Sequence, residues 1–138
     1  GLACQVRVIA ADLFAALGGV RAELIVSNPP YLPTAALEML QPEVRDHDPR
    51  VALDGGADGL DLIAPLVAGA AACLGPSGAI ALETAGGAQS AAVAALLRDA
   101  GFLKVEIRRD LAGVDRFAAG RLAEKASRAG GRAPLRGN

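Results

Sequence analysis

The chain has 138 residues, of which 52% are hydrophobic, and its formal net charge is -1. That length and hydrophobic content predict one domain with a sizeable core and exclude wholesale disorder. The near-neutral charge gives no overall electrostatic reason to wrap nucleic acid. No apolar run reaches membrane-spanning length and no signal-peptide pattern is present, so no membrane association and a cytoplasmic location are expected. Cys4 and Cys73 have neither metal-ligand spacing nor a companion histidine cluster, so no metal site is predicted.

The first predicted element is a short buried strand over residues 6–10, which is followed by Asp12, Leu13 and Phe14. A short helix is expected from Asp12 through Leu17, because Asp12 is a good N-cap residue and two glycines follow Leu17.

A second strand, over residues 24–26, leads within two residues to Asn28, Pro29, Pro30 and Tyr31. Its continuously apolar run indicates a parallel strand that is covered on both faces. Prolines lack an N–H group and fix φ, so neither a helix nor a strand ladder continues through them. A stiff loop is therefore expected at the carboxyl end of the strand, where open α/β sheets bind their ligands.

That loop has the chemistry to hold a planar NH2 group. The Asn28 side-chain oxygen and the Pro29 carbonyl are acceptors, and an amide or amino nitrogen can donate one proton to each. Tyr31 offers a flat face for stacking on the same group. Such bonds would draw the nitrogen lone pair out of conjugation and direct it at an electrophile. The alternative interpretation is a rigid turn after a buried strand, without a chemical role.

Residues 33–54 form a long connection of alternating charge, and loops of that length are commonly functional or mobile. The single histidine, His47, lies there and is expected to be exposed, without a catalytic role. The glycine-rich residues 55–59 do not follow a strand, so they are predicted to be a turn into a helix that Asp58 or Asp61 caps. The buried face of that helix is predicted from helical spacing to be Ile63, Leu66, Val67, Ala70, Ala71 and Leu74.

The last third of the chain predicts a strand over residues 79–83, a helix, and two antiparallel strands. Alternation over residues 103–108 indicates a half-exposed strand near a sheet edge, and a turn leads to a last strand over residues 116–122. Residues 123–138 lack a periodic apolar face and are predicted to be a flexible basic tail, most simply an untethered terminus. The apolar face predicted for the helix consists of Val93, Leu96, Leu97 and Ala100.

Several separated motifs carry a family resemblance. In chain order they are Asn-Pro-Pro-Tyr at 28–31, Leu-Gln-Pro-Glu-Val-Arg at 40–45, Asp-Pro-Arg-Val-Ala-Leu-Asp-Gly-Gly-Ala-Asp-Gly-Leu-Asp at 48–61, Leu-Glu-Thr-Ala-Gly-Gly-Ala-Gln at 82–89 and Arg-Asp-Leu-Ala-Gly-Val-Asp-Arg at 109–116. In their order and approximate spacing, across about residues 6–122, these motifs resemble the peptide chain release factor N5-glutamine methyltransferases, the HemK/PrmC family.

The resemblance implies an α/β fold over residues 1–122. This would be part of a class I, Rossmann-like sheet of an S-adenosylmethionine-dependent methyltransferase, with helices on both faces and a C-terminal antiparallel strand pair. The implied cofactor is S-adenosylmethionine, and the implied partner is a release factor, bound through its glutamine-bearing loop. The implied activity is methyl transfer to the side-chain amide nitrogen of that glutamine.

The resemblance also assigns residues. The catalytic residues would be Asn28, Pro29, Pro30 and Tyr31. In the cofactor site, Asn28 would lie at the methyl-bearing end and Leu13 would cover the adenine ring, while Asp12 would either bind the adenine amino group or cap its helix. Residues 33–54 would lie beside the substrate channel, and Arg50 would brace them.

The family's glycine-rich cofactor loop, its acidic ribose-binding residue and its N-terminal helical domain are not found before Val6. The chain is therefore expected to be the C-terminal part of the catalytic domain, and to bind S-adenosylmethionine weakly or not at all. The edge of strand 24–26 would be unpaired, which favours self-association or an unusual packing of residues 6–10.

Two other functions stay open. A methyltransferase acting on adenine or guanine amino groups of nucleic acid would use the same tetrapeptide, although a basic face would then be expected. A non-catalytic fragment or binding module would keep the fold without the cofactor loop.

Overall fold

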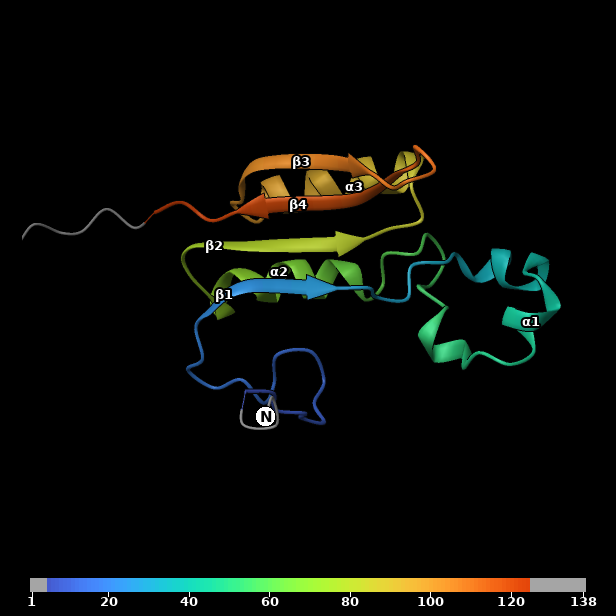
Figure 1. The fold of residues 1–138 in the computed structure, drawn as a ribbon, viewed down its shortest axis with the longest axis horizontal. Helices are drawn as coiled ribbons and strands as arrows, with labels where there is room; N and C mark the ends of the chain where they lie inside the picture. The colour runs from blue at the N-terminus through green and yellow to red at the C-terminus, as the bar shows by residue number, and fades with distance from the viewer. Residues whose placement is uncertain (1–4, 125–138) are drawn as a thin grey trace, which may run out of the picture.

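A four-stranded sheet runs through residues 5–124, the part of the chain that the computed structural model describes (Figure 1). The strands are β1 (Ala22–Ser27), β2 (Leu74–Glu83), β3 (Leu103–Arg109) and β4 (Asp115–Arg121). Their order is β1-β2-β4-β3; β1 is parallel to β2, and β4 is antiparallel to both of its neighbours. The predicted mixed α/β architecture and its C-terminal antiparallel pair are confirmed.

Both long helices cover the same face of this sheet. Helix α2 (Ile63–Cys73) connects β1 to β2, and α3 (Gly87–Asp99) connects β2 to β3. Figure 1 shows α2 and α3 on the same side of the strands. Crossovers between parallel strands are right-handed, so connections that advance across a sheet in one direction place their helices on one face. The prediction of helices on both faces is therefore wrong for the described residues.

The core lies between these helices and the sheet, and it contains most of the predicted helix faces. Of the residues predicted to be buried, Ala71, Leu96 and Ala100 are only half-buried around it. The buried apolar cluster consists of Ile63, Leu66, Val67, Ala70, Leu74, Ile80, Leu82, Val93, Leu97, Phe102 and Ala118.

The other face of the sheet is apolar and is not covered by any of residues 5–124. Leu24 and Val26 of β1 are 57% and 70% exposed, whereas Ile25 between them packs against the core. The prediction of a strand buried on both faces is therefore wrong: β1 is an edge strand with one covered face. Leu24 lines a hollow of about 490 Å³ that extends over β2, β4 and β3.

The segment before β1 differs most from prediction. Residues 6–10 are not a strand, and Val8 is 96% exposed. A strand is stable only when a neighbour completes its hydrogen-bond ladder, and no described strand lies beside this segment. The predicted helix from Asp12 is only a pair of turns, closed by the bonds from Ala15 N to Asp12 O and from Leu17 N to Phe14 O, both 2.9 Å.

The turn into α2 is also built differently. The helix begins at Ile63 with Leu62 at the N-cap and without a side-chain capping bond, so neither predicted aspartate caps it. Asp58 instead accepts the Leu60 N–H at 3.0 Å, which closes an Asx turn before the helix starts.

The C-terminal elements follow the prediction closely. In β3, Val105 is half-buried and its neighbours are exposed, as expected for an edge strand. β3 pairs with β4 through Ile107 and Ala118. Of the predicted tail, residues 123 and 124 are exposed and without regular structure, and the rest lies outside the described residues. Within residues 5–124, none of the helices combines the length and the apolar character that a membrane crossing requires.

We predict that Leu97→Ala lowers the free energy of unfolding by about 2–5 kcal/mol, because Leu97 is fully buried in α3 and its truncation leaves a cavity. Leu111→Ala is the matched control, since Leu111 is fully exposed in the β3–β4 turn, and it should change stability by less than about 0.5 kcal/mol. Urea unfolding followed by far-ultraviolet circular dichroism measures both. Equal effects of the two substitutions would contradict the described packing.

Candidate active site

The loop Asn28–Tyr31 leaves the sheet at the carboxyl end of β1, as predicted. The parallel register pairs Ser27 of β1 with Leu82 of β2, so the two strands end side by side. Asn28 is exposed and Pro29 is buried. The register therefore brings the loop next to Glu83 and to the turn that follows β2.

A cavity of about 130 Å³ lies between this loop and the end of the long connection that follows it. Within residues 5–124, neither the Asn28 carboxamide nor the Pro29 carbonyl takes part in a hydrogen bond with the chain. Both predicted acceptors are thus left without an internal donor. The cavity is lined by Asn28, Pro29, Tyr31, Leu32, Ala52 and Leu53.

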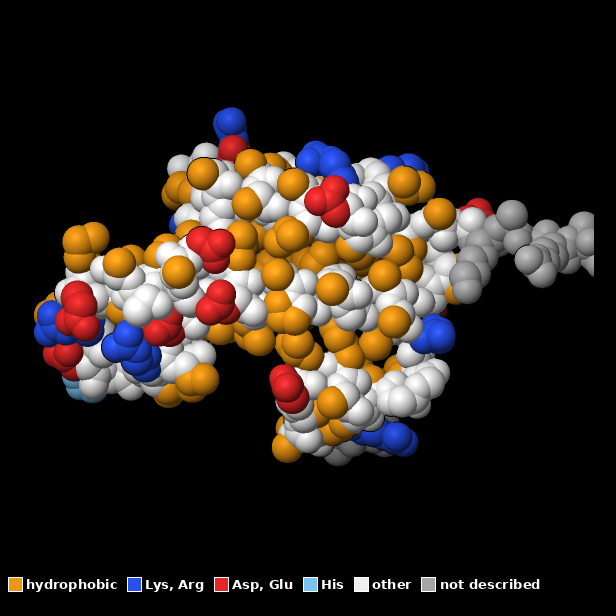
Figure 2. All heavy atoms as spheres, turned by 180° about the vertical axis from the view of Figure 1, so that it is seen from behind, with side chains coloured by type: hydrophobic (Ala, Val, Ile, Leu, Met, Phe, Trp, Pro, Cys, Tyr) orange, Lys and Arg blue, Asp and Glu red, His pale blue; other side chains and the backbone are white. Residues whose placement is uncertain are grey.

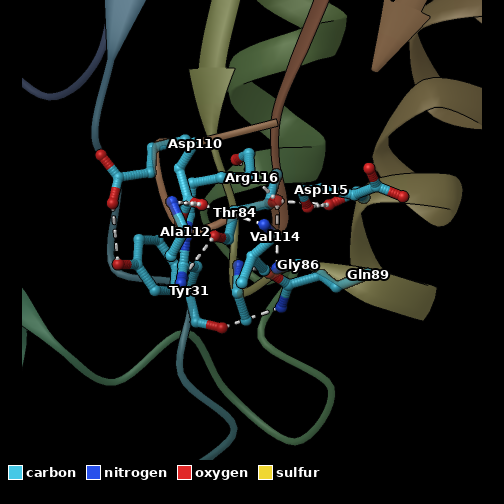
Figure 3. A network of polar contacts seen from close by, with 12 residues as sticks. Tyr31, Thr84, Gly86, Gln89, Asp110, Ala112, Val114, Asp115 and Arg116 are labelled. Carbon is cyan, nitrogen blue, oxygen red and sulfur yellow. Dashed lines mark hydrogen bonds and ion pairs between the residues drawn. The ribbon is translucent and has the colours of Figure 1, made fainter. Parts of the chain in front are cut away.

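Tyr31 is held at both of its ends (Figure 3). Its hydroxyl donates to Glu83 Oε1 at 3.1 Å, and its carbonyl accepts from Gln89 Nε2 at 2.8 Å. Burial raises the pKa of Tyr31, and the hydrogen bond to Glu83 and repulsion by its negative charge raise it further, while Arg116 acts in the opposite direction. The phenol is therefore held in its protonated form.

The β3–β4 turn supplies the next layer of contacts. Asp110 accepts the backbone N–H groups of Ala112 and Val114, each at 2.9 Å, and pairs with Arg116 Nε at 3.3 Å. The Val114 N–H bond is the main cause of a lowered Asp110 pKa, to which the bonds from Arg116 and Ala112 and the charge of Arg116 add. Arg116 also donates to the Thr84 carbonyl at 3.3 Å, so the turn is tied to the end of β2.

Two buried hydroxyls lock the end of β2 to α3. Thr84 Oγ1 and Ser90 Oγ lie 2.6 Å apart, and both side chains are fully buried. Ser90 Oγ also donates to the Asp115 carbonyl at 2.6 Å, which connects the pair to β4. The turn from β2 to α3 is therefore a rigid support for whatever it contacts.

The long connection, residues 33–54, which we call the insert, is folded and anchored at its base. Its short helices are η2 (Thr34–Met39), α1 (Pro42–Arg45) and η3 (Arg50–Ala52). Leu32 closes the base, because its N–H donates to the Leu53 carbonyl at 3.0 Å and its carbonyl accepts the Gly55 N–H at 2.8 Å. Figure 2 shows acidic and basic side chains gathered on this part of the molecule.

Asp54 is the central side chain of that base. It accepts hydrogen bonds from Thr34 Oγ1 at 2.6 Å and from the Gly56 N–H at 3.1 Å, and it pairs with Arg50 Nε at 3.2 Å. The Thr34 hydroxyl is the largest cause of a lowered Asp54 pKa, followed by the Gly56 N–H and by Arg50. The contact of Arg50 agrees with its expected bracing position, and His47 is exposed as expected.

Neither Leu13, expected to cover the adenine ring, nor Asp12, expected either to bind the adenine amino group or to cap its helix, lines this cavity. Asp12 is exposed, and Leu13 packs at the border of the core cluster. The neighbouring Phe14 fixes this segment on α2, where a Cβ added to Gly69 would come within 2.8 Å of its ring. Across residues 5–124, no group of three or more His, Cys, Asp or Glu side chains is arranged to hold a metal ion.

The sequence interpretation missed three residues that contact the site: Glu83, Gln89 and Arg116. Glu83 was recognisable only as the first charge after an apolar strand, and Gln89 and Arg116 only as the ends of two motifs. Their partners are far away in the chain, so no local pattern could indicate the contacts.

Several curated proteins resemble this chain over most of its length. It is 45% identical over 118 residues to the release factor glutamine methyltransferase of Geobacter sulfurreducens, an alignment that covers 86% of this chain and 41% of the relative. It is 49% identical over 127 residues to the enzyme of that name from Deinococcus radiodurans, covering 92% of this chain and 42% of the relative. The chain thus spans about two fifths of the length of these relatives. No family model matches it.

The mixed α/β sheet and the Asn-Pro-Pro-Tyr loop at the end of one of its strands agree with this sequence similarity. The chain belongs to the HemK/PrmC family of release factor glutamine methyltransferases.

We predict that the base of the insert loosens in acid. The Asp54 pKa is lowered in the folded state, so its contribution is present above the ordinary aspartate value of about 3.9 and is lost as the pH falls below it. Asp54→Asn should therefore lower the urea midpoint at neutral pH and have a much smaller effect in acid. Asp48→Asn, an exposed position of the same insert, is the control. An Asp54→Asn effect that is equal at both pH values would contradict the role of its charge.

Proposed function

We propose that this chain carries the methyl-acceptor site of an enzyme that transfers a methyl group from S-adenosylmethionine to the side-chain amide nitrogen of a glutamine in a peptide chain release factor. The observation that carries the proposal is a pair of acceptors, Asn28 Oδ1 and the Pro29 carbonyl, to which none of residues 5–124 donates a hydrogen bond and which lie on a strand-end loop at a small cavity. The family of the chain supplies the reaction class, since its relatives are named as release factor glutamine methyltransferases.

The fold fits one part of a class I, Rossmann-like methyltransferase sheet. Two parallel crossovers, β1–α2–β2 and β2–α3–β3, are followed by an antiparallel last strand inserted between β2 and β3. Residues 1–122 would be this catalytic part, and residues 123–138 a tail beyond it.

The cavity fits the methyl acceptor and not the whole cofactor. At about 130 Å³ it has room for a side-chain carboxamide, whereas pockets for drug-sized ligands measure about 300–1,000 Å³. Asp12 and Leu13 do not line it, so the described residues alone do not make a pocket for S-adenosylmethionine. When bound, that cofactor supplies an electrophilic methyl group on a sulfonium centre.

The residues of the loop would orient the glutamine side-chain amide before its nitrogen bonds to the methyl group. The two N–H groups of this amide would donate to Asn28 Oδ1 and to the Pro29 carbonyl, which fixes both the position and the rotation of the NH2 group. The planar carboxamide would lie against the ring of Tyr31, which lines the same cavity. Pro30 keeps the loop stiff, because its ring fixes φ. Most of the rate gain would then come from positioning.

A release-factor substrate would place the reaction with the translation machinery in the cytoplasm. The folded insert, which lies against the cavity through Ala52 and Leu53, would be the part of the chain closest to the bound peptide. The nucleic-acid alternative draws no support from the relatives described above, which are named for release factors.

The proposal is tested with a chimera in which this chain replaces the aligned segment of the Geobacter sulfurreducens relative. The chimera should methylate a glutamine of its release factor, and Asn28→Ala should lower kcat by about 10²-fold or more, because it removes an oriented hydrogen-bonding group at the reacting nitrogen. Mass spectrometry of the glutamine-bearing peptide gives the rates.

Gln5→Ala is the control, since it removes another exposed amide far from the loop in sequence, and it should leave kcat unchanged. A chimera that folds but does not methylate, or one that keeps its kcat after Asn28→Ala, would overturn the proposal.

A further inference from the structure

We propose that Glu83 and Gln89 are positioning residues that hold Tyr31 by its two ends and so set the plane of its ring beside the methyl-acceptor cavity. The benefit to catalysis rests on the function proposed above, whereas the anchoring itself is a property of this chain alone. Both residues come from one rigid unit, the end of β2 and the first turn of α3.

The first anchor is the hydroxyl. Tyr31 is half-buried, and its O–H donates to Glu83 Oε1 at 3.1 Å. Arg116 lies close enough to act on the pKa of the phenol, and it is held by Asp110 and by the Thr84 carbonyl. The acceptor is a carboxylate, so the contact is charge-assisted, but its 3.1 Å length is longer than the roughly 2.5–2.7 Å of the strongest bonds of that kind. This bond prevents the ring from swinging out of the site.

The second anchor is the main chain. Gln89 Nε2 donates to the Tyr31 carbonyl at 2.8 Å, and Gln89 Oε1 accepts the Ala85 N–H at 2.7 Å. Because both ends of the carboxamide are engaged, it cannot flip without losing two bonds. Figure 3 shows the Gln89 side chain extended toward the Tyr31 carbonyl.

The glycine-rich turn leaves room for this second anchor. Gly59 is buried with φ of +77°, and a Cβ there would collide with both the Tyr31 carbonyl oxygen and the Gln89 amide nitrogen. A Cβ on Gly55 would come within 2.8 Å of the Pro30 carbonyl oxygen. These glycines therefore allow the close approach of the loop that Gln89 fixes.

The two anchoring residues, Glu83 and Gln89, belong to one rigid part of the molecule. The Thr84–Ser90 hydroxyl pair, 2.6 Å apart and fully buried, fixes Glu83 and Gln89 relative to each other. Tyr31 is thus attached at two points to a single rigid body. The bond to the hydroxyl restricts the motion of the Tyr31 ring, and the bond to the carbonyl restricts the motion of its backbone.

The test uses the full 138-residue chain, in which Tyr31 is the single tyrosine and tryptophan is absent. The tyrosine band of the near-ultraviolet circular dichroism spectrum therefore reports on Tyr31 alone, and it is strong only when the ring is fixed. Glu83→Ala and Gln89→Glu should each lose most of this band while the far-ultraviolet spectrum is kept. Gln89→Glu keeps the side-chain size and the acceptor for Ala85. It removes the Nε2 donor to the Tyr31 carbonyl at 2.8 Å, together with the longer contacts of that nitrogen to the Asp58 and Gly59 carbonyls at 3.3 and 3.4 Å.

Two further variants separate anchoring from general destabilisation. Glu83→Gln keeps an acceptor oxygen for the phenol and should retain the band, which is rescue by the conservative change. Glu23→Ala, at an exposed position of β1, should leave the band unchanged. A band that persists in both Glu83→Ala and Gln89→Glu would overturn the proposal.

A second measurement decides the matter if Glu83→Ala does not fold. The groups that face the phenol are Glu83 of β2 and Arg116 of β4, and Asp110 pairs with that arginine. Removal of the Glu83 charge in Glu83→Gln should lower the pKa of Tyr31 toward its ordinary value of about 10, read from phenolate absorbance. Glu23→Gln is the control. An unchanged Tyr31 titration in Glu83→Gln would overturn the hydroxyl anchor.

These results are independent of the methylation assay. Loss of the tyrosine band together with an inactive chimera would overturn the proposed function and keep the anchoring. An active chimera, together with a tyrosine band that persists in Glu83→Ala and Gln89→Glu, would overturn the anchoring and keep the proposed function.

Discussion

The parallel pairing of β1 with β2 is the constraint on which the rest of the site depends. The register joins Val26 to Ala81 and Ser27 to Leu82, so both strands end at one edge of the sheet. The loop that leaves β1 and the turn that leaves β2 must then meet. This meeting produces contacts between residues that are 52 and 58 positions apart in the chain, from Tyr31 to Glu83 and to Gln89.

The composition of the loop explains why it needs support from outside. Two consecutive prolines remove the N–H groups that would close a turn, so the loop has acceptors and few donors of its own. Two donors come from outside the loop. The Gln89 side chain of α3 donates to the Tyr31 carbonyl, and the Gly55 N–H of the turn after the insert donates to the carbonyl of the next residue, Leu32. The loop is therefore stiff and anchored, while Asn28 Oδ1 and the Pro29 carbonyl remain available to accept hydrogen bonds from the proposed substrate.

The pattern of apolar residues in the sequence correctly predicted the helices and strands that pack against other described elements. The alternation in β3 and the apolar spacing of α2 and α3 were sufficient, because each has a face that packs on the described core. Residues 6–10 have the composition of a strand, but no strand within residues 5–124 pairs with them. The covering of β1 on one face follows from the order and connections of the strands, which the sequence of a single strand does not encode. Likewise, the tetrapeptide indicated the site, whereas its supports depend on tertiary contacts alone.

The central claim is that Asn28 and Pro29 receive the NH2 group of a glutamine side chain. A crystal structure of the chimera with a glutamine-bearing release-factor peptide tests it most directly. The amide nitrogen is predicted to lie within about 3.2 Å of both Asn28 Oδ1 and the Pro29 carbonyl oxygen, with its plane against Tyr31. A peptide whose glutamine binds elsewhere, with both acceptors bonded only to water, would contradict the claim.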